Sequence, residues 1–434
     1  MRHWFKDKHF KSLLRNSGYL AVSKAVAAVA ALATLAFAGR SLGVLMLGML
    51  ILIHSYAKAA SGISKFQTWQ LIVRYGGQVL SAGQTDEFKT STGFAVALDA
   101  VSGLAGMVLA LLLIPLIGNW FGITDQYLVL TMIYCTLLPI MGAATPVGVL
   151  RALDRFDLLS WQGTFHPIAR AILVWGAWMT EAPFETFVAI WFVTELGGEL
   201  LLWFLAWREL KRRDLLKGIR PTLRPDTLPG AWRFAIQVNL TGSLTAAWGP
   251  IARLVIGGLV GPAGAAVYRI AASLADAAQR PADFLAKAYY PEVVRMDLAT
   301  SRPWKLMLRG TVLATAAGVI AVLILIVGGR WLIDVVFGSD FLPAYPVLLV
   351  LIVAPLLAMI SFPLPPMLYA LDRPDGPLKA RLVATILYFA IVAPLCWRFD
   401  VIGAAIAFVL ANAVMVAILA VQVRREYGRV RANG

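Results

Sequence analysis

The chain has 434 residues, of which 59% are hydrophobic and only 15% are charged. Its mean hydropathy is +0.74, whereas about 25% of the residues in a soluble domain are charged. Apolar runs of roughly 18 to 25 residues, long enough to cross a bilayer, recur along the whole chain. This pattern excludes a water-soluble protein and predicts an all-α, polytopic membrane protein.

Twelve membrane-spanning helices are predicted. The first begins after a basic segment that imitates a secretory signal, but its length and the internal Lys24 favour a helix that is kept in the membrane. In chain order the predicted spans are 17–39, 44–66, 93–117, 127–150, 162–180, 185–207, 231–256, 263–288, 306–328, 345–368, 380–397 and 401–422.

The net charge of +15 arises mainly in the loops between these spans. With the N-terminus in the cytoplasm, about two dozen Lys and Arg residues lie in cytoplasmic segments and about three on the other side (Arg40, Arg330 and Arg398). This bias predicts an inner-membrane protein with both termini in the cytoplasm, and we expect no nucleic-acid partner. The two cysteines lie within apolar runs, so neither a disulfide framework nor a metal site is expected.

Two six-helix halves are predicted, 1–207 and 231–434, joined by a basic cytoplasmic linker, 208–230. Ala-Leu-Asp-Arg occurs at 152–155 and again at 370–373, which is 218 positions later. Gly39 and Gly43, after the first span, have counterparts at the same offset in Gly257 and Gly261. Six helices per half give both halves the same orientation in the membrane. The pattern favours a duplicated, two-lobed transporter over coincidence in an Ala- and Leu-rich chain.

Ionisable residues within the spans are the candidates for function, because each costs roughly 2.5–3.5 kcal/mol near the bilayer centre. Several share one helical face at spacings of three, four or seven residues, which predicts a water-filled cavity with cationic walls. The candidate substrate-binding residues are Lys24, Lys58, Lys65, Arg170, Arg253, Arg269, Arg280 and Lys287. The alternative is that these groups form interhelical ion pairs, or that the lysines near helix ends extend to the interface.

Acidic residues and one histidine are candidates for ion coupling. They are His54, Asp99, Glu195, Glu199, Asp276 and Asp283. Glu195 and Glu199 are four residues apart, so one of them could be protonated and carry a proton. Pairing of these acids with Arg170 is the structural alternative. A lone helical histidine such as His54 is more often a hydrogen-bonded packing group than a proton relay.

Four degenerate motifs, in this order and spacing, give the chain a family resemblance. They are Asn16-Ser17-Gly18; Arg40-Ser41-Leu42-Gly43-Val44-Leu45-Met46-Leu47-Gly48; the segment from Gly257 to Arg269; and Phe337-Gly338-Ser339-Asp340-Phe341. With these motifs the chain resembles the Wzx-type polysaccharide flippases of the multidrug/oligosaccharidyl-lipid/polysaccharide (MOP) exporter superfamily. The resemblance implies a MATE-like fold of two lobes arranged as a V around a central cavity.

The resemblance also implies a function. Family members move undecaprenyl-diphosphate-linked oligosaccharides, such as O-antigen or exopolysaccharide repeat units, from the cytoplasmic to the periplasmic leaflet. Basic residues on helices one, two and eight line the cavity of relatives, and the matching positions here are Lys24, Lys58 and Arg269. Lysine stands at two of them, where relatives often have the bidentate arginine. Coupling to H⁺ or Na⁺ is implied without any other cofactor. Membrane lipids, glycosyltransferases and a polysaccharide polymerase are the implied partners.

Rival functions differ in the features that they require. A membrane glycosyltransferase or polymerase generally needs a large periplasmic loop, and the longest outer loop here is about 329–344, so no enzyme is expected. No phosphate-binding GxxxxGK[ST] motif is present. A multidrug antiporter for cations should have a more acidic cavity, and lipid II flippases typically have two more helices. Both remain as alternatives within the superfamily.

Overall fold

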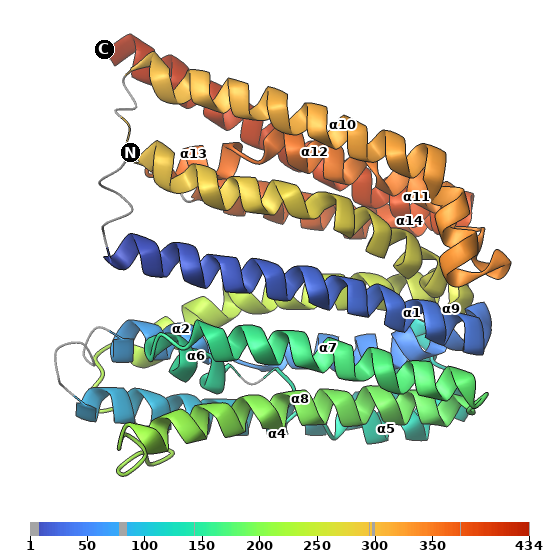
Figure 1. Cartoon of the computed structure of the whole chain (residues 1–434), viewed down its shortest axis with the longest axis horizontal. Helices are drawn as coiled ribbons and strands as arrows, with labels where there is room; N and C mark the ends of the chain where they lie inside the picture. Colours follow the sequence, from blue (N-terminus) through green and yellow to red (C-terminus); the bar gives the residue numbers. More distant parts are fainter. Residues whose placement is uncertain are drawn as a thin grey trace. The chain divides into compact units, whose positions relative to one another are not determined.

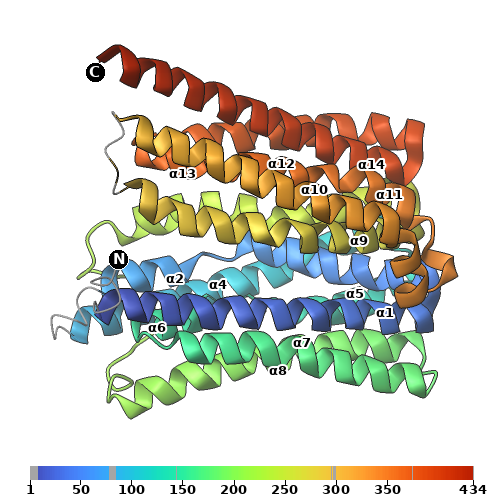
Figure 2. The ribbon, with the colours of Figure 1, turned by 45° about the horizontal axis from the view of Figure 1, so that its top comes forward.

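The computed structural model describes residues 8–77, 85–142, 144–294, 296, 300–373 and 375–433. The chain forms two compact units, Met1–Gly258 and Leu259–Gly434. The first unit therefore includes the beginning of the predicted second half. The long helices within each unit run alongside one another (Figures 1 and 2).

The first unit is built around the helix α1 (Lys8–Ser64), which packs against α7 (Phe156–Met179), and α7 packs in turn against α8 (Phe184–Arg212). The remaining elements of this unit are α2 (Thr68–Leu71), the π-helix η2 (Ile72–Gly77), α4 (Thr85–Ile117), the 3₁₀ helices η3 (Asn119–Phe121) and η4 (Asp125–Tyr127), α5 (Leu128–Cys135), α6 (Thr145–Ala152) and the start of α9 (Ala231–Val294).

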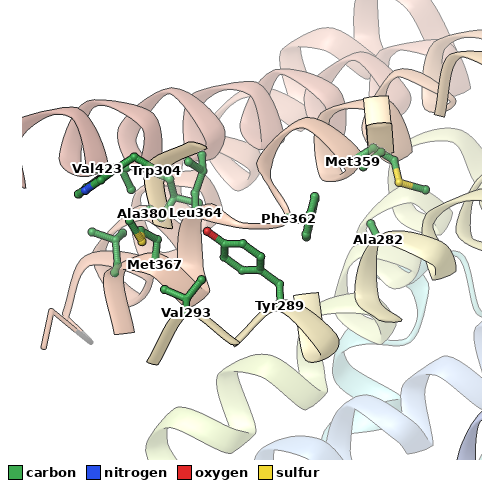
Figure 3. Packing of buried hydrophobic residues seen from close by; sticks show 13 residues of the cluster. Ala282, Tyr289, Val293, Trp304, Met359, Phe362, Leu364, Met367, Ala380 and Val423 are labelled. Carbon is green, nitrogen blue, oxygen red and sulfur yellow. The ribbon is translucent and has the colours of Figure 1, made fainter. Parts of the chain in front are cut away.

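The second unit contains the rest of α9, with α14 (Asp375–Asn433) packed against α11, α12 and α13. Its other elements are α10 (Ser301–Phe337), η5 (Ser339–Phe341), α11 (Ala344–Leu351), α12 (Val353–Ser361) and α13 (Leu364–Ala370). Figure 3 shows a hydrophobic core cluster of this unit, which includes Met367 and Val423. In it the Tyr289 ring lies edge-on to the Phe362 ring, with centroids 5.8 Å apart.

Every predicted span overlaps helical segments in the described part of the chain. Three long helices each contain two spans, separated by a single non-helical residue: Gly43 in α1, Gly261 in α9 and Asp400 in α14. The two glycines have nearly the same conformation, with φ/ψ of 68°/179° and 78°/173°. This region suits glycine, which has no Cβ to clash. The fourth and tenth spans are broken into shorter helices instead.

Seven helical segments among the described residues are long and apolar enough to cross a membrane. Two of them, Ser23–Gly76 and Asp375–Arg429, have 54 and 55 residues. At about 1.5 Å per residue each is roughly 80 Å long, far more than the bilayer core of about 30 Å. Each therefore accommodates two crossings, which turn at Gly43 and Asp400. The predicted all-α membrane architecture is confirmed.

The turns of the two halves repeat at the level of single residues. The residues with positive φ include the pairs Gly122 and Gly338, Asp154 and Asp372, and Glu181 and Asp400. The members of each pair are 216 to 219 positions apart, close to half of the chain. Asp154 and Asp372 share a φ of 56°. Together with Gly43 and Gly261, these pairs support an internal duplication.

The packing of the two halves repeats as well. In the first unit a core cluster contains Leu150, Leu202 and Ala206. The residues 217 or 218 positions later, Leu368, Leu419 and Val423, are buried together in the second unit. In each half, this core packs the end of the fourth span against the sixth span.

The segment 213–230, which follows α8, is anchored to the first unit. Leu215 and Leu228 are buried in two of its core clusters. The Thr222 amide donates to the Gly93 carbonyl (3.4 Å), and the Tyr75 hydroxyl donates to the Pro229 carbonyl (3.1 Å). The segment predicted to be a linker is thus part of the packed structure.

Candidate functional site: a buried charged cluster in the first unit

Glu195 of α8 is the centre of a charged cluster in the first unit. Only 5% of Glu195 is exposed. Its Oε1 lies 2.5 Å from the Lys58 Nζ of α1, and its Oε2 lies 3.0 Å from an Arg170 guanidinium nitrogen of α7. Three helices thus contribute one charge each, and 137 positions separate Lys58 from Glu195. Of the two predicted roles for Glu195, the pairing with Arg170 is confirmed.

The guanidinium of Arg170 is held from several sides. Its Nε donates to the Thr194 hydroxyl (2.8 Å), and its Nη2 lies 3.0 Å from His166 Nε2. It also lies over the Trp191 ring, 5.3 Å from the centroid. Arg170 is therefore fixed in one orientation, which positions it as a permanent counter-ion of Glu195.

His166 and Thr194 were not among the residues singled out from the sequence. His166 lies 3.9 Å from the Glu195 carboxylate and can approach α8 because residue 198 is glycine. A Cβ at Gly198 would come within 3.1 Å of the imidazole. The spacing of four residues between His166 and Arg170 was a signal for their shared helix face.

The same stretch of α1 carries two further polar contacts. His54 Nδ1 lies 2.8 Å from the Tyr134 hydroxyl of α5. Fully buried Ser55 accepts a hydrogen bond from Arg253 Nε (2.9 Å), which comes from the first part of α9. Because Ser55 and Lys58 are three residues apart on one helix, Arg253 joins the side of α1 that holds Lys58.

The charged side chains of this group differ in exposure. Lys58 and Arg170 pair with the Glu195 carboxylate, and Arg253 donates to Ser55 on the same side of α1. The side chain of Glu195 is 6% exposed, and that of Arg170 is 13% exposed, whereas that of Lys58 is 32% exposed. The group therefore combines a buried ion pair between Arg170 and Glu195 with an accessible ammonium group at Lys58. We call Lys58, Arg170, Glu195 and Arg253 the cationic cluster.

A second group of predicted residues lies around the end of α1 and has different partners. Buried Lys65 donates to the Pro139 carbonyl (2.7 Å). Asp99 accepts hydrogen bonds from the Thr68 hydroxyl (3.0 Å) and the Thr145 amide (2.9 Å). These contacts reach the break in the fourth span, between α5 and α6.

Glu199 also satisfies a backbone group at the break in the fourth span. Its Oε1 accepts a hydrogen bond from the Gly142 amide (2.8 Å). Helix ends within a membrane leave backbone groups that water cannot satisfy. The carboxylates of Asp99 and Glu199 and the ammonium of Lys65 satisfy three such groups. We call Lys65, Asp99 and Glu199 the helix-break group.

The other predicted residues lie elsewhere on α1, in the second unit, or outside what the structure describes. Lys24 is exposed on α1. Arg269 and Arg280 of α9 are half-buried and Asp276 is exposed, all within the second unit. The side chains of Asp283 and Lys287 lie outside the described residues. The structure thus brings together three of the eight predicted cations, Lys58, Arg170 and Arg253.

Comparisons with known proteins agree with this fold. No protein-family model matches the chain. The chain is 38% identical over 347 residues to inner membrane protein YghQ of Escherichia coli (strain K12), a match that covers 80% of this chain and 98% of that protein.

Solved structures of transporters share the fold at low sequence identity. An inward-facing multidrug resistance MATE family transporter of the MOP superfamily superimposes with a TM-score of 0.73 at 14% identity, over 94% of this chain and 95% of the other. The lipid II flippase MurJ, in an inward closed conformation, gives a TM-score of 0.67 at 12% identity, over 95% of this chain and 90% of the other. The chain therefore belongs to the family of the E. coli inner membrane protein YghQ, as a multi-pass inner-membrane protein with a MATE-like fold.

Proposed function

We propose that this protein is a flippase that moves an anionic, undecaprenyl-diphosphate-linked oligosaccharide from the cytoplasmic to the periplasmic leaflet by alternating access. The observation that supports this proposal is the cationic cluster. Lys58 and Arg170, from two helices, share the buried Glu195 carboxylate there, and Arg253 reaches Ser55 on the Lys58 side of α1. An ionisable group within a membrane is costly to keep, so an ammonium that stays accessible beside a buried ion pair favours an anionic ligand.

The geometry suggests how the head group would bind. Lys58 is the accessible cation of the cluster, with 32% of its side chain exposed. The diphosphate linkage carries about two negative charges and accepts charge-assisted hydrogen bonds. A phosphate oxygen can take the place of Glu195 Oε1 at the Lys58 ammonium, while Arg170 continues to hold Glu195. The polyprenyl tail stays in the lipid during this exchange.

The alternative substrates differ in charge or in head group. A cation-coupled multidrug antiporter would need an accessible acidic site for its organic cation, whereas the accessible group of the cluster is the Lys58 ammonium and its carboxylate is buried. A lipid II flippase would use the same cationic chemistry, because lipid II also carries a diphosphate. The cluster recognises the diphosphate, which O-antigen and exopolysaccharide units share, and the glycan itself would be selected elsewhere.

Ion coupling is part of the proposal. Proton or sodium entry would return the empty carrier, and Asp276, which is exposed on α9, is the candidate acid, because the Glu195 carboxylate is already paired with Lys58 and Arg170. Asp99 and Glu199 are already engaged by backbone amides at the helix break. Glycosyltransferases that make the lipid-linked unit and a polymerase that consumes it are the proposed functional partners.

The test is the leaflet in which the lipid-linked glycan resides. We expect the glycan to accumulate in the inner leaflet of a strain that lacks the gene, beyond the reach of a periplasmic labelling reagent. Wild type and Lys58→Arg should restore labelling, whereas Lys58→Ala should not, at equal membrane levels. Lys217→Ala, in an exposed loop, is the matched control. Normal labelling without the protein would contradict the flippase proposal and direct attention to cation export.

A further inference from the structure

Each half of the chain carries the same two charged motifs near the ends of its fourth and sixth spans. Asp-Arg-x-Asp occurs at 154–157 and, 218 positions later, at 372–375. Arg-Glu-x-x-Arg occurs at 208–212 and, 217 positions later, at 425–429. Both motifs lie on the side that the Lys and Arg bias assigns to the cytoplasm. The transport site does not use any of them.

In the first unit the two motifs meet at Glu209, whose side chain is 3% exposed. Its Oε1 pairs with Arg155, and its Oε2 lies 2.9 Å from Arg212 and 3.8 Å from Arg213. Arg155 also makes a bidentate pair with Asp157, with N–O distances of 2.9 and 2.8 Å. We call this group the first clamp. It ties the corner after α6 to the inner end of α8.

In the second unit the corresponding residues meet at Glu426. Its Oε1 lies 3.4 Å from Arg373 and 2.7 Å from Arg429. We call these three residues the second clamp. It ties the corner after α13 to the C-terminal part of α14, near the core of Figure 3 that contains Met367 and Val423.

The backbone presents the two arginines in the same way. The Arg155 amide donates to the Leu150 carbonyl (2.8 Å), and the Arg373 amide donates to the Leu368 carbonyl (2.9 Å). The residue before each arginine is an aspartate with a φ of 56°. Leu150 and Leu368 belong to the equivalent cores of the two units. The two clamps are therefore equivalent structural elements of the two halves.

The ion pairs of the two clamps differ in their exposure to solvent. The Arg155 side chain is 21% exposed, whereas that of Arg373 is 48% exposed and that of Glu426 is 18% exposed. Among the described residues, Asp375, the counterpart of Asp157, forms its ion pair with Lys379 (2.7 Å) and not with the arginine of its own motif. The position of Lys379 is held by Trp161 in the first half, 218 positions earlier. A lysine at this position thus draws the second aspartate away from the second clamp.

We propose that the clamp residues are positioning residues of the transport cycle, with the first clamp a permanently closed joint and the second clamp a joint that opens and closes. Exposed ion pairs are weak because water and salt compete with them, whereas a buried carboxylate with several cations is expensive to expose. Lys379 produces this difference between the clamps, because its ion pair with Asp375 competes with a pair between Asp375 and Arg373. The second half can then change the angle at its inner corner, while the first half moves as a rigid body.

The first test is amide hydrogen exchange of the full chain in lipid nanodiscs. We expect the Arg373 amide and the 424–429 segment to exchange about tenfold faster or more than the Arg155 amide and the 207–212 segment, because exchange reports local opening. Lys379→Ala releases Asp375 and should slow exchange at Arg373, whereas Lys379→Arg keeps the pair and should leave it unchanged. Equal protection of both clamps in the wild type would overturn the proposal, as would an unchanged rate at Arg373 in Lys379→Ala.

The second test closes each clamp covalently and rests on the proposed flippase function. In a background with Cys135→Ala and Cys396→Ala, the pairs Arg155→Cys/Glu209→Cys and Arg373→Cys/Glu426→Cys are joined by a short, reducible bifunctional thiol reagent. We expect cross-linking of the second clamp to stop translocation of the lipid-linked glycan until the reagent is reduced, and cross-linking of the first to leave it unchanged.

Unchanged translocation with the second clamp cross-linked would overturn the proposed joint. Absence of translocation by the uncross-linked wild type would instead contradict the flippase function. Hydrogen exchange needs no substrate, so the two failures are distinguishable.

Discussion

Lys58 lies near the end of α1 and Lys65 directly follows that helix, yet the two lysines have different kinds of partner. Lys58 pairs with a carboxylate from another helix and retains access to solvent. Lys65 is buried and donates to the backbone carbonyl of Pro139 at a helix break. A buried cation whose partner is a backbone group at a helix break is explained by the fold. A cation that stays accessible beside a buried ion pair is available for a ligand.

The largest effect on stability is expected from Arg170→Ala, within the cationic cluster. The substitution leaves Glu195 buried with Lys58 as its remaining ion pair and removes the partner of His166 and Thr194. We expect the free energy of unfolding to fall by about 3 kcal/mol, the lower end for a buried pair that loses one partner. Thermal denaturation in detergent, followed by tryptophan fluorescence, measures this loss. The double variant Arg170→Ala/Glu195→Gln should recover part of it, and no recovery would contradict the pairing.

A smaller loss is expected from Asp99→Ala in the helix-break group. The change leaves the Thr145 amide and the Thr68 hydroxyl without the acceptor that they share. Unsatisfied buried groups of this kind cost roughly 2 kcal/mol in unfolding free energy. We expect reduced thermal stability, with translocation per folded molecule retained. A stable Asp99→Ala protein that has lost translocation would show instead that this group takes part in transport.

Lys58→Ala should have a still smaller effect on stability and the clearest effect on function. Because a third of the Lys58 side chain is exposed, we expect less than about 1 kcal/mol of lost unfolding free energy. Translocation of the lipid-linked glycan should nevertheless fall at least about tenfold. The same two measurements on Lys65→Ala should give the reverse order, with stability more affected than function. Equal behaviour of the two lysines would remove the distinction between the groups.

The smallest effect concerns pH and the first clamp. Hydrogen bonds from Arg155 lower the pKa of Asp157 below its ordinary value of 3.8. A carboxyl group whose pKa is lowered on folding contributes stability above its unfolded pKa, and that contribution is lost as the pH falls through the folded pKa. Below about pH 4, the wild type should therefore lose slightly more thermal stability than Asp157→Asn. Parallel pH profiles of the two proteins would contradict this role of Asp157.

The membrane architecture could be predicted from the sequence because length and hydrophobicity decide it locally. Each apolar run must form a helix to satisfy its backbone in lipid, and every predicted span overlaps helical segments of the described chain. The repeated Ala-Leu-Asp-Arg motif likewise indicated related halves, and its aspartates at 154 and 372 share a φ of 56°. Local sequence patterns were sufficient for both predictions.

The partners of the charges could not be predicted in the same way. Helical periodicity places Lys58 on a face of its own helix, but it does not say that a residue 137 positions away will meet it. The break in the fourth span was equally hidden, because its apolar composition resembles that of a continuous helix. The hydrogen bonds of Asp99 and Glu199, both candidates for ion coupling, to backbone amides of that break were therefore not predicted.

The most direct measurement is translocation by the purified full chain in proteoliposomes that contain a fluorescent polyprenyl-diphosphate glycan. A membrane-impermeant quencher reports how much of the probe has reached the other leaflet. We expect the wild type and Lys58→Arg to equilibrate the probe, Lys58→Ala to do so at least about tenfold more slowly, and an uncharged polyprenol glycan not to be moved. Equal rates for the wild type and Lys58→Ala, or equal movement of the charged and uncharged probes, would contradict a flippase that recognises the diphosphate through the cationic cluster.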